Sequence, residues 1–127
     1  MAINEKLFKA LESATHYLKE VISTLNVDFK DFEYAVWHLA ADLEYALLLF
    51  SLLLGEHDAS SWRPNSVGNM DLSKTIDSIR DLLDRSIKAL AVGNKLDAYK
   101  FAYMARHHVF IIQEDISKRK KQEVGKK

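Results

Sequence analysis

A run of ten residues without a charge, from Ala46 to Gly55, constrains this chain more than any other feature. Ser51 supplies the only polar side chain in the run. Its length is about half of the ~20 apolar residues that a bilayer span needs. Charged residues bracket it closely on both sides: Asp42, Glu44, Glu56 and Asp58. We therefore interpret the run as part of a buried helix in a water-soluble protein, and we expect no contact with a membrane.

The helix predicted over residues 29–54 is apolar on two faces. One face has the spacing of a bundle core: Phe32, Ala35, Val36, Leu39, Leu43, Ala46, Leu47, Phe50, Leu53 and Leu54. The opposite face is also apolar, with Leu49 beside it: Tyr34, Trp37, Ala41, Tyr45, Leu48 and Leu52. A helix in an antiparallel bundle buries roughly half of its circumference. This helix therefore has more apolar surface than a single bundle can use.

Three kinds of cover for the second face remain open. The segment 56–70 could fold over it through Trp62 and Val67, a second copy of the chain could pack on it about a two-fold axis, or a different protein could bind it. We favour the second copy, because two side chains cannot cover six turns of helix. Trp37 and Tyr45 also suit an interface, since aromatic residues are enriched at interface centres. The sequence thus predicts a homodimer.

Three more helices follow from the 3–4 spacing of apolar residues, over 4–25, 71–93 and 94–118. The connections between the first and second helices and between the third and fourth are very short, so each pair should fold back as an antiparallel hairpin. We expect an all-α fold, a four-helix bundle in a single domain over residues 1–117, followed by a basic, disordered tail over 118–127. The longer connection 56–70 leaves the topology open.

Cysteine is absent from the chain, and glycine and proline are scarce. The absence of cysteine excludes disulfides, thiolate metal sites and cysteine nucleophiles. It also suits a reducing compartment, so we expect a cytoplasmic protein. Scarce glycine and proline favour an all-helical chain over a β-fold.

The histidines do not form a recognisable metal or catalytic motif. Helical di-metal sites use Glu-x-x-His pairs, and this spacing does not occur. His38 and Asp42 form the only His–carboxylate pair that could point inward, and we interpret them as a hydrogen-bonded pair rather than metal ligands, because a metal needs three or more convergent ligands. Gly-x-Ser-x-Gly and glycine-rich phosphate-binding motifs are also absent from the sequence. We therefore expect no cofactor and no catalytic residues.

Charge is unevenly distributed, although the net charge is zero. Residues 118–127 hold six basic residues and one acidic residue, which leaves twelve basic and seventeen acidic residues in the remainder. The acidic body argues against a phosphate-binding groove on the folded part. A contact with nucleic acid through the tail and the neighbouring edge of the fourth helix remains open, and its candidate residues are Arg106, His107, His108, Lys118, Arg119, Lys120 and Lys121. We expect His107 and His108 to lie on the polar side of that helix.

Two stretches, "FEYAVWHLAADLEYALLLFSLLLGEHD" and "LAVGNKLDAYKFAYMARHHVF", resemble helices of the HEPN-like superfamily. The resemblance covers about half of the chain. It implies a small four-helix protein of a kind that often dimerises and partners nucleotidyltransferases. Members active as ribonucleases carry an Arg followed by His after four to six residues, and none of the five arginines has a His at that spacing: Arg63, Arg80, Arg85, Arg106 and Arg119. The resemblance thus implies the dimeric scaffold without the nuclease activity.

These observations together predict a non-catalytic scaffold or interaction module that acts as a homodimer or binds another helical protein. The alternative is a nucleic-acid-associated accessory protein that uses the basic C-terminal tail.

Overall fold

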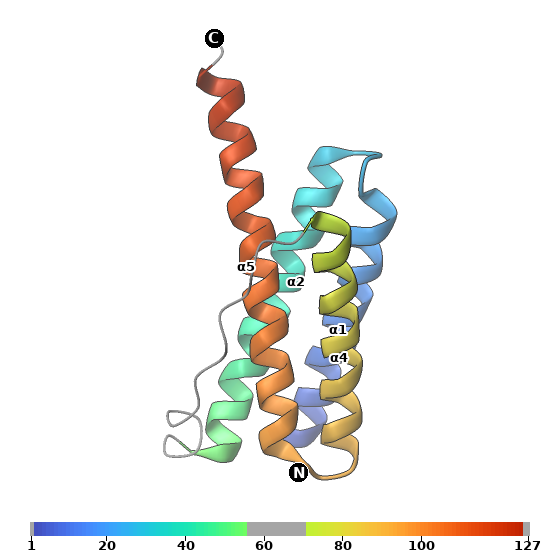
Figure 1. Cartoon of the computed structure of the whole chain (residues 1–127). Coiled ribbons are helices and arrows are strands. Elements are labelled where there is room, and N and C mark those ends of the chain that lie inside the picture. Colours follow the sequence, from blue (N-terminus) through green and yellow to red (C-terminus); the bar gives the residue numbers. More distant parts are fainter. Residues whose placement is uncertain (1, 56–70, 126–127) are drawn as a thin grey trace.

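The computed structural model describes residues 2–55 and 71–125, and this part of the chain consists of four α-helices (Figure 1). The helices are α1 (Ala2–Thr24), α2 (Phe29–Leu54), α4 (Leu72–Ala91) and α5 (Lys95–Gly125). No β-strand occurs in the described ranges. The predicted all-α four-helix bundle is confirmed. The proposed cover through Trp62 and Val67 lies outside the described residues.

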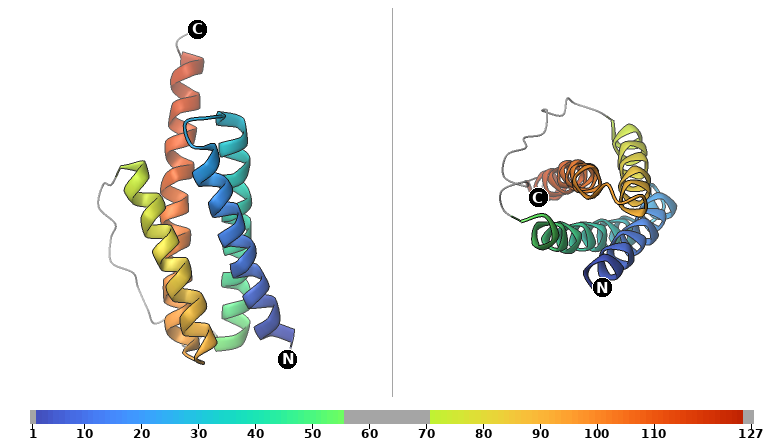
Figure 2. Two further views of the ribbon diagram at one scale, coloured as in Figure 1. Left: turned by 90° about the vertical axis from the view of Figure 1, so that its right-hand side faces the viewer. Right: turned by 90° about the horizontal axis from the view of Figure 1, so that it is seen from below.

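Both predicted hairpins are present. α1 packs against α2 and α4 packs against α5, while α2 also packs against α5 and α1 against α4. Viewed along the bundle, the four helices stand around a common centre with α1 and α5 at opposite corners (Figure 2). α2 ends at one end of the bundle and α4 begins at the other end (Figure 1). Each helix therefore runs antiparallel to both of its neighbours, which resolves the topology that the sequence left open.

Short side chains fix where the helices begin and end. The Asp28 carboxylate accepts a hydrogen bond from the backbone N–H of Asp31 at the start of α2, and Asp71 accepts one from Lys74 at the start of α4. These caps satisfy N–H groups that have no partner inside the helix. Asn26 lies in the turn after α1 with a φ of 64°, a left-handed conformation that asparagine tolerates.

The core combines large aliphatic side chains with alanines where helices approach closely. Phe50, Leu39, Leu43, Ile79, Leu83 and Ile112 are among its largest fully buried members. Four alanines in α2 and α5 are completely buried: Ala46, Ala98, Ala102 and Ala105. Interiors of folded proteins are packed as densely as organic crystals. The small residues therefore set the close approach of the hairpins and leave no room for larger side chains.

α5 extends further than the sequence indicated. We predicted its end near Lys118, but the helix continues to Gly125 and projects past the α1–α2 turn (Figure 1). Ile116 is the last residue of α5 among those described as buried. The basic segment is thus an extension of a bundle helix through Gly125, because strong helix formers such as Lys, Arg and Gln follow Ile116 without a break.

Candidate interaction surface

The predicted second face of α2 is exposed along the helix. We call this surface the α2 strip, and it consists of Tyr34, Trp37, Ala41, Tyr45, Leu48 and Leu52. Tyr34, Leu48 and Leu52 are more than half exposed, at 62%, 56% and 64%, and Trp37 and Tyr45 are each 45% exposed. The strip contains no charged residue and is ~27 Å long at 1.5 Å per residue. Single exposed apolar residues are ordinary, but a continuous strip of this length is not.

Leu49 differs from its predicted position. Its helical angle placed it beside the second face, but it is only 5% exposed. Leu49 belongs to the apolar core with Ala46 and Phe50. The α2 strip is therefore narrower than the sequence indicated, because its edge beside α1 is buried.

Ion pairs to α5 border the other edge of the α2 strip. Arg106 of α5 donates through Nε to the carboxylate of Glu44, and Lys120 pairs with Glu33. These carboxylates lie on the narrow polar side of α2. Such exposed pairs contribute at most about 1 kcal/mol each to stability. They join α5 to α2 along this edge of the strip.

Two aromatic residues of α5 stand exposed beyond this border. Tyr103 is 36% and Phe110 is 41% exposed, and they lie seven residues apart on one side of the helix. The Arg106 guanidinium lies over the Phe110 ring at 5.7 Å, within the range of a cation–π contact. A shallow hollow of about 210 Å³ separates the two helices, lined by Glu44, Leu47, Tyr103, Arg106 and His107. Apolar side chains are thus exposed on both α2 and α5, with the Arg106–Glu44 ion pair between them.

The structure divides the candidate nucleic-acid residues instead of assembling them. The prediction that His108 lies on the polar side of its helix is wrong, because the residue is 5% exposed. Its Nδ1 lies 2.9 Å from the backbone carbonyl of Met104, which can only accept, so Nδ1 carries the proton and donates. His108 follows Phe101 by two helical turns, and Arg85 of α4 lies over the Phe101 ring. The side of α5 that carries His108 therefore faces α4 rather than solvent.

Burial also alters the acid–base behaviour of His108. Desolvation lowers the pKa of its imidazole below the ordinary value of 6.5, and the hydrogen bond with Met104 opposes this effect only in part. A neutral ring at physiological pH cannot contribute charge to a phosphate contact. Arg106 is already paired with Glu44, and His107 is half-buried. The proposed edge from Arg106 to His108 thus contains one paired cation and one buried ring.

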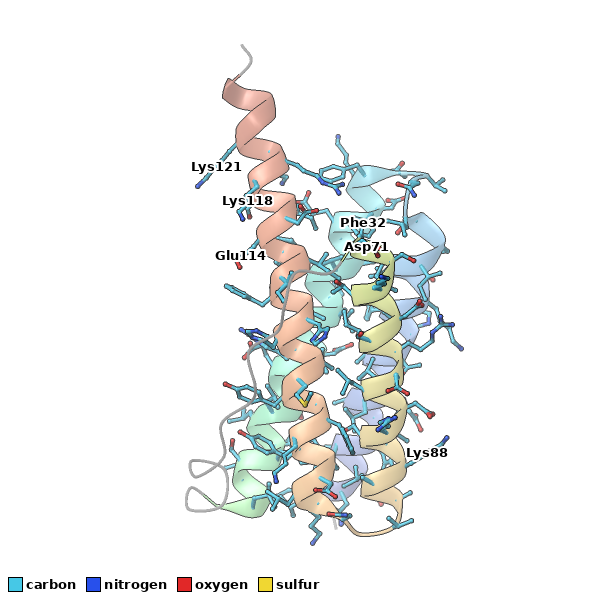
Figure 3. The ribbon with its side chains drawn as sticks, viewed as in Figure 1. Phe32, Asp71, Lys88, Glu114, Lys118 and Lys121 are labelled. Carbon is cyan, nitrogen blue, oxygen red and sulfur yellow. The ribbon has the colours of Figure 1, made fainter. Side chains whose placement is uncertain are left out.

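The four basic residues at the start of the extension point in different directions. Arg119 pairs with Asp115 at 3.0 Å, and Lys120 pairs with Glu33 of α2. Lys118 and Lys121 point away from the bundle, on the same side of α5 as Glu114 (Figure 3). Lys118 and Lys121 are therefore better placed to meet an anionic partner than Arg119 and Lys120.

His38 and Asp42 have different partners on α1. The His38 ring stacks on Tyr17 with 4.7 Å between ring centroids and also contacts Tyr34 at 4.2 Å. The Asp42 carboxylate accepts a 2.5 Å hydrogen bond from Ser13 Oγ. No group of three or more His, Asp or Glu side chains in the described ranges is arranged to hold a metal ion. Both residues thus contact neighbours across the first hairpin.

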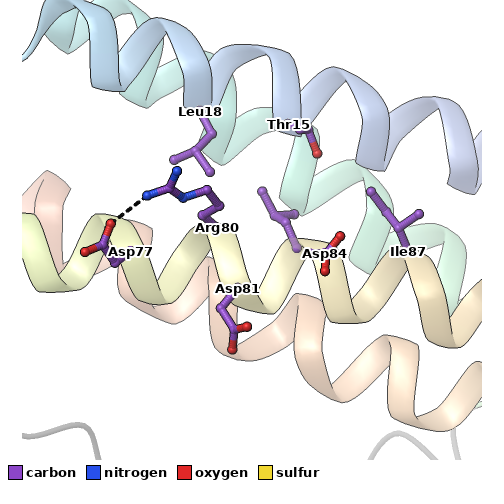
Figure 4. Close-up of a pocket in the computed structure, with 8 residues that line it drawn as sticks. Thr15, Leu18, Asp77, Arg80, Asp81, Asp84 and Ile87 are labelled. Carbon is purple, nitrogen blue, oxygen red and sulfur yellow. Dashed lines mark hydrogen bonds and ion pairs between the residues drawn. The ribbon is translucent and has the colours of Figure 1, made fainter.

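A pocket between α1 and α4, of about 440 Å³, was not predicted from the sequence (Figure 4). Leu18, Leu83 and Ile87 supply apolar walls, and carboxylates of α4 stand at its edge. Each of these carboxylates already has a basic partner one turn away on the same helix: Asp77 with Arg80, Asp81 with Arg85, and Asp84 with Lys88. The pocket has no aligned set of groups that would carry out a reaction.

By length and composition alone, α2 could cross a membrane. Core helices of soluble proteins satisfy the same criteria. In this fold α2 packs against both α1 and α5 and places nine residues among the buried set. Asp42 and Glu44 also lie near its middle, where a bilayer would impose a large cost on a charge. Packing in the bundle explains the apolar character of the face of α2 that meets α1 and α5. The α2 strip is the apolar surface that this packing leaves exposed.

Comparison with known proteins found no matching family model, no matching curated protein and no matching solved structure.

Proposed function

We propose that this chain is a non-catalytic interaction module of the cytoplasm that works as a homodimer through the α2 strip. The observation that carries the proposal is the exposure of six uncharged residues along one face of α2. Trp37 and Tyr45 lie within the strip, and aromatic side chains of this kind supply most of the binding energy at protein interfaces.

The exposed area is of the right size for an interface. From their exposed fractions, the three aromatics of α2 together with Tyr103 and Phe110 leave about 450 Å² of side chain open to solvent. Leu48 and Leu52 add to this area. The largest apolar patch on a typical monomer is about 300–600 Å², and a standard interface buries about 800 Å² on each partner. With the two leucines, the exposed area reaches the upper end of the range for a monomer and more than half of the area that a standard interface buries on each partner.

A second copy is the occupant that the observations favour. Two-fold symmetry is the commonest arrangement among oligomers and needs a surface that is complementary to itself. An uncharged strip meets this condition without charge repulsion when two copies face each other. The resemblance to HEPN-like proteins, which often dimerise, supports the same assignment. A different helical protein on this face is the alternative occupant.

Light scattering coupled to size-exclusion chromatography tests the proposal. We expect a mass twice the 14.6 kDa of one chain, falling toward one chain on dilution. Leu48→Lys places a charge in the strip and should give a monomer at every concentration. A monomer for the unsubstituted protein across the whole dilution series contradicts the homodimer.

Ile22→Lys is the matched control for this experiment. Ile22 is an apolar residue of α1 outside the strip and is 40% exposed, close to the 56% of Leu48. The control variant should retain the dimeric mass. Circular dichroism of both variants should show unchanged helicity, which separates lost association from lost folding.

The outward position of Lys118 and Lys121 supports a second candidate function, association with nucleic acid. Binding through these lysines would be electrostatic and would weaken as salt neutralises the phosphates. Fluorescence anisotropy with mixed-sequence RNA at low salt tests it, comparing the intact chain with Lys118→Gln/Lys121→Gln. Equal affinity of the two proteins, or no binding by either, contradicts this function. The homodimer does not depend on the result.

A further inference from the structure

We infer that two copies pair with their α2 helices antiparallel, about a two-fold axis that passes Leu43 of α2 and the Arg106–His107 step of α5. The inference rests on the proposed homodimer and adds the direction and register of its pairing. Two sets of residues, one on α2 and one on α5, support this register independently.

Side-chain size along the α2 strip is complementary about Leu43. Ala41 and Tyr45 lie two residues to either side of this position, and Tyr34 and Leu52 lie nine residues to either side. An antiparallel pair centred here sets Tyr45 of one copy against the partner's Ala41, and the same contact recurs across the axis. The small side chain leaves room for the ring, which is the alternation that closely packed helices use.

A parallel pair would lose this complementarity. A two-fold axis along the helices sets each residue against its own copy. Tyr45 would then meet the partner's Tyr45, and Trp37 the partner's Trp37, while the two Ala41 side chains would face a gap between bulky neighbours. Unfilled space and crowded rings both reduce stability.

The exposed aromatics of α5 give a second centre of symmetry. Tyr103 and Phe110 are equally distant from the step between Arg106 and His107. Both are aromatic and of similar size, so an axis at this step places Tyr103 against the partner's Phe110. Aromatic pairs of this kind stabilise an interface beyond the area that they bury.

The two centres lie at the same level of the bundle. Arg106 bonds directly to Glu44, the residue that follows Leu43. One axis perpendicular to the helices therefore passes both centres. This axis reverses the direction of every helix but does not exchange the two edges of the interface. The two α5 helices therefore lie along one edge of the dimer and the two α1 helices along the other.

Spin-label distances measure both direction and register. The chain has no cysteine, so a single Cys substitution gives one label in each copy. Lys30 and Ser51 are exposed positions of α2 outside the α2 strip. At 1.5 Å per residue, an antiparallel pair centred at Leu43 separates the two Lys30→Cys labels by about 40 Å along the axis and the two Ser51→Cys labels by about 25 Å.

Double electron–electron resonance on the two variants should give these two distances. Two short distances, each below about 20 Å, would mean a parallel pair and would overturn the inference while leaving the homodimer intact. A shifted centre lengthens one distance and shortens the other by about 3 Å per residue, and a shift beyond two residues also overturns it. A monomeric mass with no dipolar signal would instead contradict the proposed homodimer itself.

Discussion

Ser86 of α4 donates a 2.7 Å hydrogen bond to the backbone carbonyl of Ala98 in α5, and both residues are fully buried. This bond joins the two helices of the second hairpin near their turn. Such a bond contributes about 1 kcal/mol to the free energy of unfolding, so Ser86→Ala should be less stable than a matched Ser→Ala control in the same helix by about this amount. Urea denaturation at fixed protein concentration measures the change.

Ser78→Ala serves as the control for Ser86. Ser78 is half-buried in the same helix, so both substitutions gain the same helix propensity, about 0.5 kcal/mol. The difference between the two variants therefore reports the hydrogen bond. Equal stability of Ser86→Ala and Ser78→Ala would mean that the bond contributes nothing.

The buried alanines of α5 predict sensitivity to added volume. Ala105 is fully buried, and Ala105→Leu should destabilise the fold by about 1–3 kcal/mol because the core has no space for the added carbons. Ala91→Leu, at the exposed end of α4, should change stability by less than about 0.5 kcal/mol. Thermal unfolding followed by circular dichroism compares them. A stable Ala105→Leu variant would contradict the close approach of α5 to its neighbours.

His108 predicts a dependence of stability on pH. Because its folded-state pKa is lowered from 6.5, the unfolded chain binds a proton first as the pH falls. Stability should be full above pH 6.5 and should decrease from there down to the folded pKa. His108→Gln retains an N–H donor without titrating, so this part of the decrease should disappear. Urea unfolding from pH 7.5 to 5.5 distinguishes the two proteins, and parallel curves would refute the assignment.

The N-cap of α4 can be tested with two substitutions at one position. Asp71 accepts a 2.8 Å hydrogen bond from the backbone N–H of Lys74. Asp71→Ala removes the acceptor and should cost about 1 kcal/mol, whereas Asp71→Asn keeps an oxygen there and should cost less. Chemical denaturation gives both values. Equal losses for the two variants would show that the charge rather than the hydrogen bond stabilises the start of α4.

Periodicity and capping residues predicted most of the architecture. Both ends of α2 were predicted as observed, because Asp28 caps the start of the helix and Gly55 follows its last residue. The direction in which α4 runs could not be obtained this way, because the connection 56–70 is long enough for either topology. The end of α5 was also missed, since Lys118 and the residues after it favour helix as well as they favour a charged tail.

The surface was less predictable than the core. The α2 strip was predicted from an excess of apolar residues on one helix, which requires no knowledge of neighbouring helices. His108 was misplaced because α5 packs against two helices, so its buried arc is wider than one apolar stripe suggests. The pairing of Arg106 with Glu44 joins residues 62 positions apart in the chain, and no local pattern contains it.

In the proposed antiparallel dimer, the projection of α5 past the α1–α2 turn would form two cationic poles. Because the proposed two-fold axis reverses helix direction, the α5 ends beyond Ile116, which project from each bundle, would point away from each other at opposite ends of the dimer. A compact anionic molecule would reach only one pole at a time. A long polyanion, or two separate ones, could be held at both, so the dimer would act as a bridge.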